Sequence, residues 1–327
     1  MTNNKTKGFM FIITIVLSLY LSGCSLANFS ASGKETPITN VNVYQGTEGL
    51  EIEFLTNSPP EKVYEGENFV VSTLLNNKGA YPITSGKVVL THEPDYFDVP
   101  TTSSTFNLLG KTMYDPSEHN IQKSFNLNTK KLEPKSTGHD SIVLVTACYD
   151  YGTKLNTEVC IDTDPQNIKA IEKSCNTEDL SFSGQGAPIA ITKIETKMII
   201  GEGGKVRPNF WIYVQNHGDG QVISKSSIDK ACGSASIDKN ELNGVVLKDL
   251  KFSQYTLADM DCRPKPETSL NPVLKLTDNE QYFICTLRDD VSIPADTSTF
   301  KTGLYIELEY GYTLTKSKEF TIKKYNT

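Results

Sequence analysis

The residues with the clearest chemistry in this sequence are its cysteines. The 327-residue chain has seven, of which Cys24 stands alone near the beginning and six lie between Cys148 and Cys285. None is spaced as Cys-x-x-Cys, the arrangement typical of structural zinc sites. Once Cys24 is set apart an even number remains, and in an oxidising compartment such a set is expected to form disulfide bonds.

One disulfide can be predicted from strand patterns. Apolar residues alternate within Ile142–Tyr151, which places Cys148 on the outward face of the strand. If Val159 and Ile161 face the core, Cys160 between them also faces outward. A hairpin turning at 152–154 would place the two cysteines opposite each other, with Cβ atoms roughly 4.5–5.5 Å apart. We therefore predict a Cys148–Cys160 bond. Four cysteines then remain: Cys175, Cys232, Cys262 and Cys285. They can pair in three ways, and one bridge could tie Cys175, in the connector, to the insertion of the second half.

Carboxylate pairs are the candidate metal ligands. They occur at Asp162/Asp164, Asp259/Asp261 and Asp289/Asp290. Two carboxylates can begin a calcium site, which needs six to eight oxygen ligands. Solvated loop acids are the commoner explanation, so only Asp162/Asp164, in the connector between the two halves, is kept as a structural calcium candidate. No other cofactor is expected.

Nothing in the sequence has the spacing of a catalytic or zinc motif. The four histidines are too far apart for His-x-His or His-x-x-x-His. No Gly-x-Ser-x-Gly elbow is present to expose a serine nucleophile. We therefore predict no catalytic residue and no enzymatic activity.

An aromatic pair is the candidate binding surface. Phe210, Ile212 and Val214 are expected to face the core, which turns Trp211 and Tyr213 outward. Two interpretations stay open: an exposed face that binds a ligand, or a face covered by the insertion of about 20 residues in the second half. We favour the covered face.

The elements that must position these residues are β-strands. Apolar residues alternate with polar ones at Leu50–Phe54, and further strands are predicted at Phe69–Leu75, Val88–Leu90 and Ile142–Tyr151. No convincing amphipathic helix separates them. The sequence therefore predicts an all-β fold of the sandwich type.

The second half repeats the first. The segment 208–218 matches 69–79, with Asn216 over Asn77 and Gly218 over Gly79. Tyr310-Gly311-Tyr312 matches Tyr149-Asp150-Tyr151 at a larger offset, so the second copy carries about 20 extra residues between its early and late strands. The Asn-x-Gly segments are expected to use positive φ for a tight turn.

This repeat predicts two immunoglobulin-like sandwiches in tandem. The first spans 47–161 and the second 187–327, with an insertion around 225–285. A connector at 162–186 joins them.

The chain begins like a secreted lipoprotein. Lys5 and Lys7 precede an apolar run, 8–20, and Leu21-Ser22-Gly23-Cys24 resembles a lipobox. The resemblance implies a signal peptide at 1–23 and a lipid on Cys24. The stretch that follows is rich in Ser, Thr, Asn and Gly, which predicts a flexible tether at 24–46. An uncleaved signal anchor is the alternative, and both place the rest of the chain outside the membrane.

The strand ending in Asn-x-Gly, the later proline and the closing strands resemble CARDB-type modules of archaeal and bacterial surface proteins. The Cys-Ile-Asp-Thr-Asp-Pro connector and the Gly-Gln-Gly-Ala-Pro segment are similar to parts of surface lipoproteins. The resemblance implies a non-catalytic, membrane-anchored module for adhesion or envelope architecture, with a protein or glycan partner.

Two other functions are weighed against it: a solute- or glycan-binding lipoprotein that uses the aromatic face, and, third, an extracytoplasmic enzyme. A formal net charge of −7 without a basic cluster argues against a nucleic acid partner.

Overall fold

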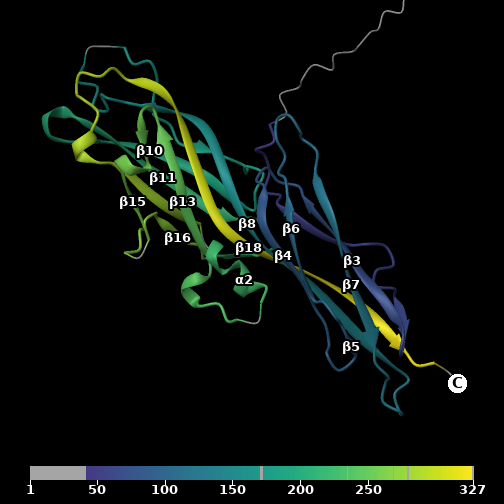
Figure 1. The fold of residues 1–327 in the computed structure, drawn as a ribbon. Coiled ribbons are helices and arrows are strands. Elements are labelled where there is room, and N and C mark those ends of the chain that lie inside the picture. The colour runs from purple at the N-terminus through teal and green to yellow at the C-terminus, as the bar shows by residue number, and fades with distance from the viewer. Residues whose placement is uncertain (1–41, 170–171, 234, 268, 278–279, 326–327) are drawn as a thin grey trace, which may run out of the picture. The chain divides into compact units, whose positions relative to one another are not determined.

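The structure of the chain is a computed structural model that describes residues 42–169, 172–233, 235–267, 269–277 and 280–325. The predicted signal peptide, Cys24 and most of the tether lie outside the described residues. Asn42–Thr327 forms one compact unit, whose regular structure is almost entirely β-strand, as predicted (Figure 1). Every helix among the described residues is too short or too polar to span a bilayer.

The strands form three mainly antiparallel sheets. The first outer sheet contains, in spatial order, β1 (Leu50–Phe54), β3 (Asn68–Asn77), β7 (His119–Thr129) and β5 (Phe97–Asp98). The second outer sheet contains β15 (Met260–Arg263), β17 (Gln281–Leu287), β11 (Val206–Asn216), β10 (Ile189–Ile200) and β9 (Leu180–Ser181).

The third sheet, which we call the shared sheet, has nine strands. Its main path runs through β14 (Tyr255–Thr256), β13 (Gly244–Phe252), β18 (Phe300–Lys323), β8 (Gly138–Ile161), β4 (Ile83–Thr91) and β6 (Ser103–Leu108). Three short strands join it: β12 (Gln221–Ile223), β16 (Val273–Lys275) and β2 (Lys62–Tyr64). The short helices of the described residues are α2 (Ile228–Ala231) and the 3-10 helices η1 (Glu202–Gly204), η2 (Lys225–Ser227), η3 (Lys239–Glu241), η4 (Leu257–Asp259) and η5 (Asp289–Val291).

Two very long strands form the middle of the shared sheet. β8 and β18 each have 24 residues and pair antiparallel along their whole length, from Phe300↔Ile161 to Lys323↔Gly138. At about 3.3 Å per residue, each strand is roughly 80 Å long. Figure 1 shows the yellow β18 lying beside the teal β8. The shared sheet therefore runs uninterrupted through both copies of the repeat.

The turn predicted at 152–154 is wrong. Gly152 lies inside β8 and pairs with Glu309 of β18. A Cβ at this position would lie 2.5 Å from the Tyr81 ring and 2.8 Å from the carbonyl oxygen of Leu308. The glycine is needed because an aromatic ring covers the strand closely here, and not because the chain reverses.

The core lies between the shared sheet and each outer sheet. Phe69 of β3 packs edge-on against Phe320 of β18, with ring centroids 5.5 Å apart. In the other half Phe210 of β11 packs against Phe252 of β13 at 5.2 Å. The side chains predicted to face inward along the two long strands are each at most 2% exposed: Val143, Val145, Ala147, Tyr149, Tyr151, Leu304, Ile306, Leu308, Tyr310 and Tyr312.

The internal repeat is confirmed by strand register. Leu50 of β1 pairs with Asn77 of β3, and Ile189 of β10 pairs with Asn216 of β11. The sequence offset from Leu50 to Ile189 equals that from Asn77 to Asn216, which is the offset of the predicted match. The extra residues of the second copy lie at 224–243. They separate β12 from β13, which both pair with β18, whereas β4 of the first copy is continuous. The division into domains at 47–161 and 187–327 stays a prediction.

The repeated asparagine and glycine hold the same contacts in both copies. Tyr151 donates its hydroxyl hydrogen to Asn77 Oδ1 (2.9 Å), and Tyr312 donates to Asn216 Oδ1 (3.1 Å). A Cβ on Gly79 would collide with the Tyr151 hydroxyl, and a Cβ on Gly218 would collide with the Tyr312 hydroxyl. None of these asparagines and glycines has a positive φ. The positive-φ turn predicted here is therefore wrong, since the glycine is required by close packing.

Candidate functional site

The cysteines form three disulfides, and the predicted Cys148–Cys160 bond is not among them. Both cysteines lie on β8, twelve residues apart on one continuous strand, which separates them by about 40 Å. The prediction failed because it depended on the hairpin at 152–154. The bonds formed are Cys148–Cys232, Cys160–Cys175 and Cys262–Cys285. This disulfide content suits an oxidising or extracellular environment.

The Cys148–Cys232 bond fastens the insertion of the second copy to the long strand of the first. It spans 84 residues of sequence. Ile223, Ile228 and the two cysteines form a small apolar cluster on the outer side of the shared sheet, separate from the main core. The insertion therefore covers this part of the shared sheet.

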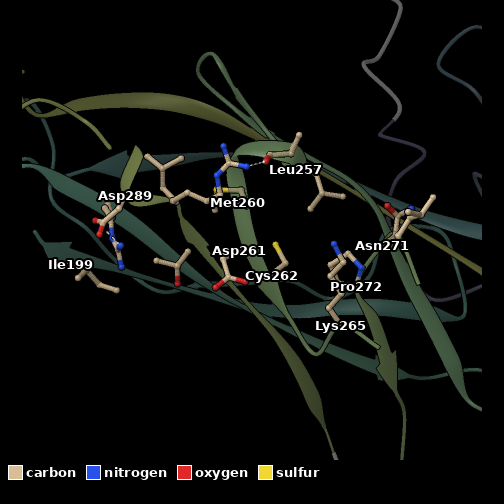
Figure 2. Close-up of a pocket in the computed structure, with 15 residues that line it drawn as sticks. Ile199, Leu257, Met260, Asp261, Cys262, Lys265, Asn271, Pro272 and Asp289 are labelled. Carbon is tan, nitrogen blue, oxygen red and sulfur yellow. Dashed lines mark hydrogen bonds and ion pairs between the residues drawn. The ribbon is translucent and has the colours of Figure 1, made fainter. Parts of the chain in front are cut away.

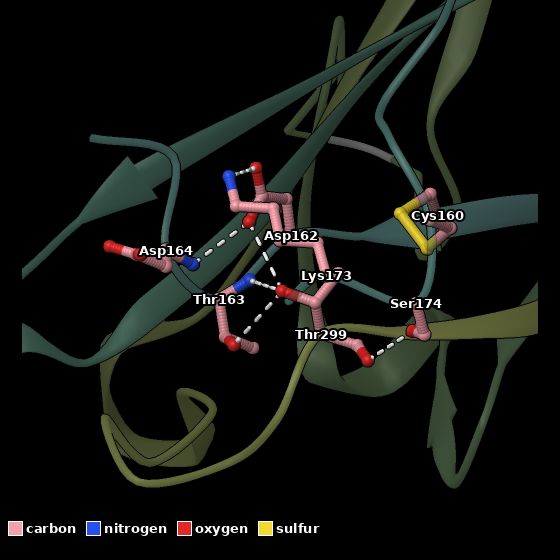
Figure 3. The surroundings of a disulfide bond; sticks show 8 residues. Cys160, Asp162, Thr163, Asp164, Lys173, Ser174 and Thr299 are labelled. Atoms are coloured by element: carbon pink, nitrogen blue, oxygen red, sulfur yellow. Dashed lines mark hydrogen bonds and ion pairs between the residues drawn. A yellow bond between two sulfur atoms is a disulfide. The ribbon is translucent and has the colours of Figure 1, made fainter. Parts of the chain in front are cut away.

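The connector is held by the Cys160–Cys175 bond and by Asp162 (Figure 3). Lys173 Nζ lies 2.7 Å from Asp162 Oδ2, and the Asp164 amide donates to Asp162 Oδ1 (2.9 Å). The Asp164 carboxylate accepts the amides of Ile168 and Lys169, both at 2.9 Å. The predicted calcium ligands are thus occupied by protein donors. Among the described residues, no three His, Cys, Asp or Glu side chains are grouped to hold a metal ion.

The predicted aromatic face lies on the outer side of the second outer sheet and is not covered by the insertion. Instead, the chain after it supplies β17, which pairs beside β11 and adds Tyr282 to the face. The Trp211 ring stacks on Tyr282, with centroids 5.0 Å apart, and Lys197 Nζ lies 4.3 Å from its centroid. The covered face that we favoured is therefore wrong. Trp211 is partly exposed and lies between a ring and an ammonium group.

A carboxylate organises the cations of this face. Glu195 lies within 2.8 Å of Lys193 Nζ and 3.1 Å of Lys197 Nζ, and it accepts the Tyr213 hydroxyl at 2.9 Å. These hydrogen bonds, that of Lys193 foremost, lower the pKa of Glu195 to about 2. The lysines beside Trp211 and Tyr213 are thereby held in place.

Three successive outward residues of β11 carry polar atoms that are closed off from solvent. They are Arg207 Nε, Asn209 Oδ1 and Trp211 Nε1, and none has a hydrogen-bond partner within the described protein. A buried donor or acceptor without a partner costs about 1–3 kcal/mol. Atoms of the same kind occur in the first copy as well, among them Thr73 Oγ1 and Asn76 Oδ1 of β3.

The same face continues into a hollow of about 820 Å³ (Figure 2). Arg207 lines it, and so does Thr286 of β17, the register partner of Asn209. Residues of 257–265 and 270–272 line the other side. The charged residues lining the hollow are Arg207, Asp261, Lys265, Arg288 and Asp289.

The cations of the hollow differ in how they are paired. Arg207 Nη1 lies 2.7 Å from Asp289 Oδ1, but that aspartate side chain is 80% exposed. Arg288 is held by Asp290 at 2.9 Å and by the carbonyl oxygen of Ala258. Lys265 is exposed and makes no ion pair with another described residue.

Sequence reasoning missed this hollow. It singled out the pairs Asp259/Asp261 and Asp289/Asp290, and Asp261 and Asp289 do line one hollow together. The segments that carry them are brought together by the pairing of β15 with β17, which the Cys262–Cys285 bond fastens at directly opposite residues. The signal that could have indicated the hollow is that both acidic pairs lie close to a cysteine, Cys262 or Cys285, in the second half of the chain.

Comparison with known proteins adds little. No family model matches the sequence, and no curated protein matches it. One similar solved structure is the C-terminal domain of the Streptococcus pyogenes antigen I/II-family protein AspA. It is 7% identical, with 85% of this chain and 100% of that chain covered and a TM-score of 0.16.

A second is the C-terminal domain of the Streptococcus agalactiae AgI/II polypeptide BspA, which is 8% identical. Here 84% of this chain and 98% of that chain are covered, with a TM-score of 0.13. At such TM-scores neither likeness carries an argument about fold or function.

Proposed function

We propose that the protein is a lipid-anchored module of the cell surface, without catalytic activity, that serves adhesion or envelope architecture. The observation that carries the proposal is the continuous pairing of β8 with β18 through both copies of the repeat. The lipobox-like Leu21-Ser22-Gly23-Cys24 supports the anchor. The resemblance to CARDB-type modules agrees with such a role.

The continuous strand pair makes a stiff support. To bend one copy against the other at Tyr151↔Tyr310, the backbone hydrogen bonds of both long strands would have to break. Four tyrosines pack on one another at this place, with centroids 5.7–6.3 Å apart: Tyr149, Tyr151, Tyr310 and Tyr312. A stiff, disulfide-bonded module holds the surfaces of its two copies in a fixed arrangement.

The ionisable groups of the module serve its hydrogen bonds and ion pairs. Among the described residues, every carboxylate with a displaced pKa is displaced downward: Glu51, Glu93, Asp115, Glu118, Asp164, Glu195, Glu241, Asp290 and Glu307. Such groups stay ionised and serve hydrogen bonds and ion pairs.

The test is fractionation of the natively expressed protein together with its intact mass. We expect loss of residues 1–23, a lipid mass on Cys24 and recovery in the membrane fraction. Cys24→Ser should abolish both the lipid mass and the loss of residues 1–23, whereas Ser25→Ala, the matched neighbour, should leave both unchanged. A soluble cytoplasmic protein with free thiols would overturn the proposal.

A further inference from the structure

We propose that the loop joining β6 to β7, residues 109–118, inserts its apolar side chains into the lipid surface to which the chain is anchored. This inference rests on the proposed function, because the lipid on Cys24 is what holds the module at a bilayer. The loop adds a second, apolar contact to that anchor. Together the two contacts fix which side of the module faces the membrane.

The loop 109–118 exposes three large apolar side chains. Leu109 is 65% exposed, Met113 is 59% exposed and Tyr114 is fully exposed. Elsewhere among the described residues, no two exposed side chains of this kind lie within five positions of each other. Single exposed apolar residues are ordinary on a protein surface, whereas a group of them marks a contact with an apolar partner or a lipid surface.

A polar turn presents the two outermost of these side chains. The Thr112 amide donates to the carbonyl oxygen of Asp115 (2.8 Å), and the Asp115 amide donates to Thr112 Oγ1 (3.0 Å). Met113 and Tyr114 therefore occupy the corner of the turn, where glycine, proline, asparagine and serine are the usual residues. A tyrosine places its ring among the upper acyl chains and its hydroxyl among the headgroups, which suits a membrane interface.

The charged side chains of the loop are engaged by neighbours. Lys111 Nζ lies 3.4 Å from Glu118 Oε1. The Asp115 carboxylate accepts the Ser117 amide (3.3 Å) and lies 3.3 Å from His119 Nε2. These groups can stay in the hydrated headgroup layer, because the two corner residues of the turn carry no charge. Insertion of the corner therefore buries no ionised group.

The second copy makes the same connection without an apolar turn. β16 pairs with β13 as β6 pairs with β4, and β17 pairs with β11 as β7 pairs with β3. The link from β16 to β17 is 276–280, Leu-Thr-Asp-Asn-Glu, which is half as long. Its one large apolar residue, Leu276, is buried. Joining these two strands therefore does not require the exposed apolar residues of the first copy.

The loop lies beside the place where the described chain begins. The Lys111 amide donates to the carbonyl oxygen of Gly79 (2.9 Å). The next residue, Ala80, donates its amide to the carbonyl oxygen of Gly186 (2.8 Å). Gly186 in turn donates to the carbonyl oxygen of Gly46 (2.8 Å). Three hydrogen bonds thus connect the start of the loop to the first residues of the folded unit.

The tether explains why a lipid surface is the partner. Cys24 precedes Asn42, where the folded unit begins, by 18 residues. A flexible tether of that length has an r.m.s. span of about 25 Å. Such a short link gives the loop a roughly millimolar effective concentration at the bilayer, so a weak affinity of the loop itself is enough. A soluble partner would have no such advantage at this place.

The test places a tryptophan at the corner of the turn. In a Trp211→Phe chain, which lacks the only native tryptophan, Tyr114→Trp provides a single fluorescent reporter. The full-length lipidated protein is reconstituted in dioleoylphosphatidylcholine vesicles, with or without lipids brominated near the top of the acyl chains. We expect the brominated lipids to quench the emission about twofold, since interfacial side chains reach this depth.

The matched control is Leu270→Trp in the same background. Leu270 is 94% exposed but belongs to the second copy, so its reporter should stay unquenched. Adding Leu109→Ser and Met113→Ser to the Tyr114→Trp chain should lower the quenching, because less apolar surface then enters the lipid. All these side chains are exposed, so their substitution leaves the fold intact. Salt at about 0.5 M should leave the quenching unchanged, because the contact is apolar.

The proposal is overturned if the reporter at position 114 is quenched no more than the reporter at position 270, or if salt abolishes the quenching. Both results are measured on vesicles that carry the protein, so the lipid anchor would stand. A chain that fails to float with the vesicles would instead overturn the anchor, and this inference with it.

Discussion

Asp150 lies directly opposite Gly311 in the pairing of β8 with β18. These two residues are also equivalent in the internal repeat, which matches Tyr149-Asp150-Tyr151 with Tyr310-Gly311-Tyr312. The other pairs from Ile161↔Phe300 to His139↔Ile322 are each converted by the repeat into a different pair of the ladder, as Tyr149↔Tyr312 into Tyr151↔Tyr310. A local two-fold axis therefore passes through Asp150 and Gly311 and relates the two copies as in a symmetric dimer.

The copies differ at the axis itself. The Asp150 carboxylate accepts the amides of Thr84 (2.9 Å) and Ser85 (2.7 Å), which fixes the start of β4. At Gly311 a Cβ would lie 2.8 Å from the Ile223 side chain and 2.9 Å from the carbonyl oxygen of Ser224. The second copy needs glycine there because its insertion begins against the strand.

The paired asparagines predict unequal costs. Asn77 is fully buried and also donates to two carbonyl oxygens, so Asn77→Ala leaves several buried groups without partners. We expect a loss of about 3 kcal/mol in the free energy of unfolding. Asn216→Ala, at the partly exposed equivalent, should cost about 1 kcal/mol. Urea unfolding measures both, and equal losses would contradict the unequal burial argued here.

The tyrosine cluster predicts an anomalous alkaline titration. Burial raises the pKa of Tyr312 to about 12 and those of Tyr149 and Tyr310 well above 10. Because the folded state holds these protons more tightly, their stabilising effect is present below pH 10 and is lost as the pH rises past 12. Absorbance at 295 nm should show incomplete ionisation at pH 11 until the chain unfolds. Complete ionisation of a folded chain would refute the burial.

The disulfides predict a definite peptide map. Non-reducing digestion should link Cys148 to Cys232 and Cys160 to Cys175. Replacing both Cys148 and Cys232 with Ala should cost roughly 4 kcal/mol, because this bond closes the longest loop of the three. Replacing Cys160 and Cys175 should cost roughly 3 kcal/mol. A linked Cys148–Cys160 peptide would contradict the continuous strand.

Glu195 predicts an acid-dependent loss of stability. Its pKa is about 2 in the folded protein, against an ordinary value of 4.5, so its contribution is present above pH 4.5 and is lost as the pH falls towards 2. Thermal melts of Glu195→Gln should depend less steeply on pH in this range. If Glu195→Gln and the unaltered chain lose stability with the same pH slope, this role of Glu195 is contradicted.

Much of the fold could be predicted from the sequence because it is repeated within it. Alternation identified the inward faces of both long strands, and the Asn-x-Gly match located equivalent strands in the two halves. Gly152 misled the prediction, because a glycine that turns a chain and one that admits an aromatic ring look alike in sequence. The error carried into the disulfide prediction.

The reasoning that cysteines opposite each other on paired strands form a disulfide holds for another pair of cysteines. Cys262 and Cys285 are register partners on β15 and β17 and are bonded. The hollow could not be predicted, since Arg207 and Lys265 come to line it only through the pairing of strands that are distant in sequence. Trp211 was placed outward correctly, but its stacking on Tyr282 depended on that same pairing.

The continuity of β8 is tested most directly by native-state hydrogen exchange at residues 152–156. If the two copies share one uninterrupted sheet, the amides in this segment that bond across the ladder should exchange only by global unfolding, as slowly as those at 143–147. If 152–154 were a hairpin turn within a separate first sandwich, its amides would exchange rapidly while the flanking strands stayed protected, and the account of a stiff, shared-sheet module would be contradicted.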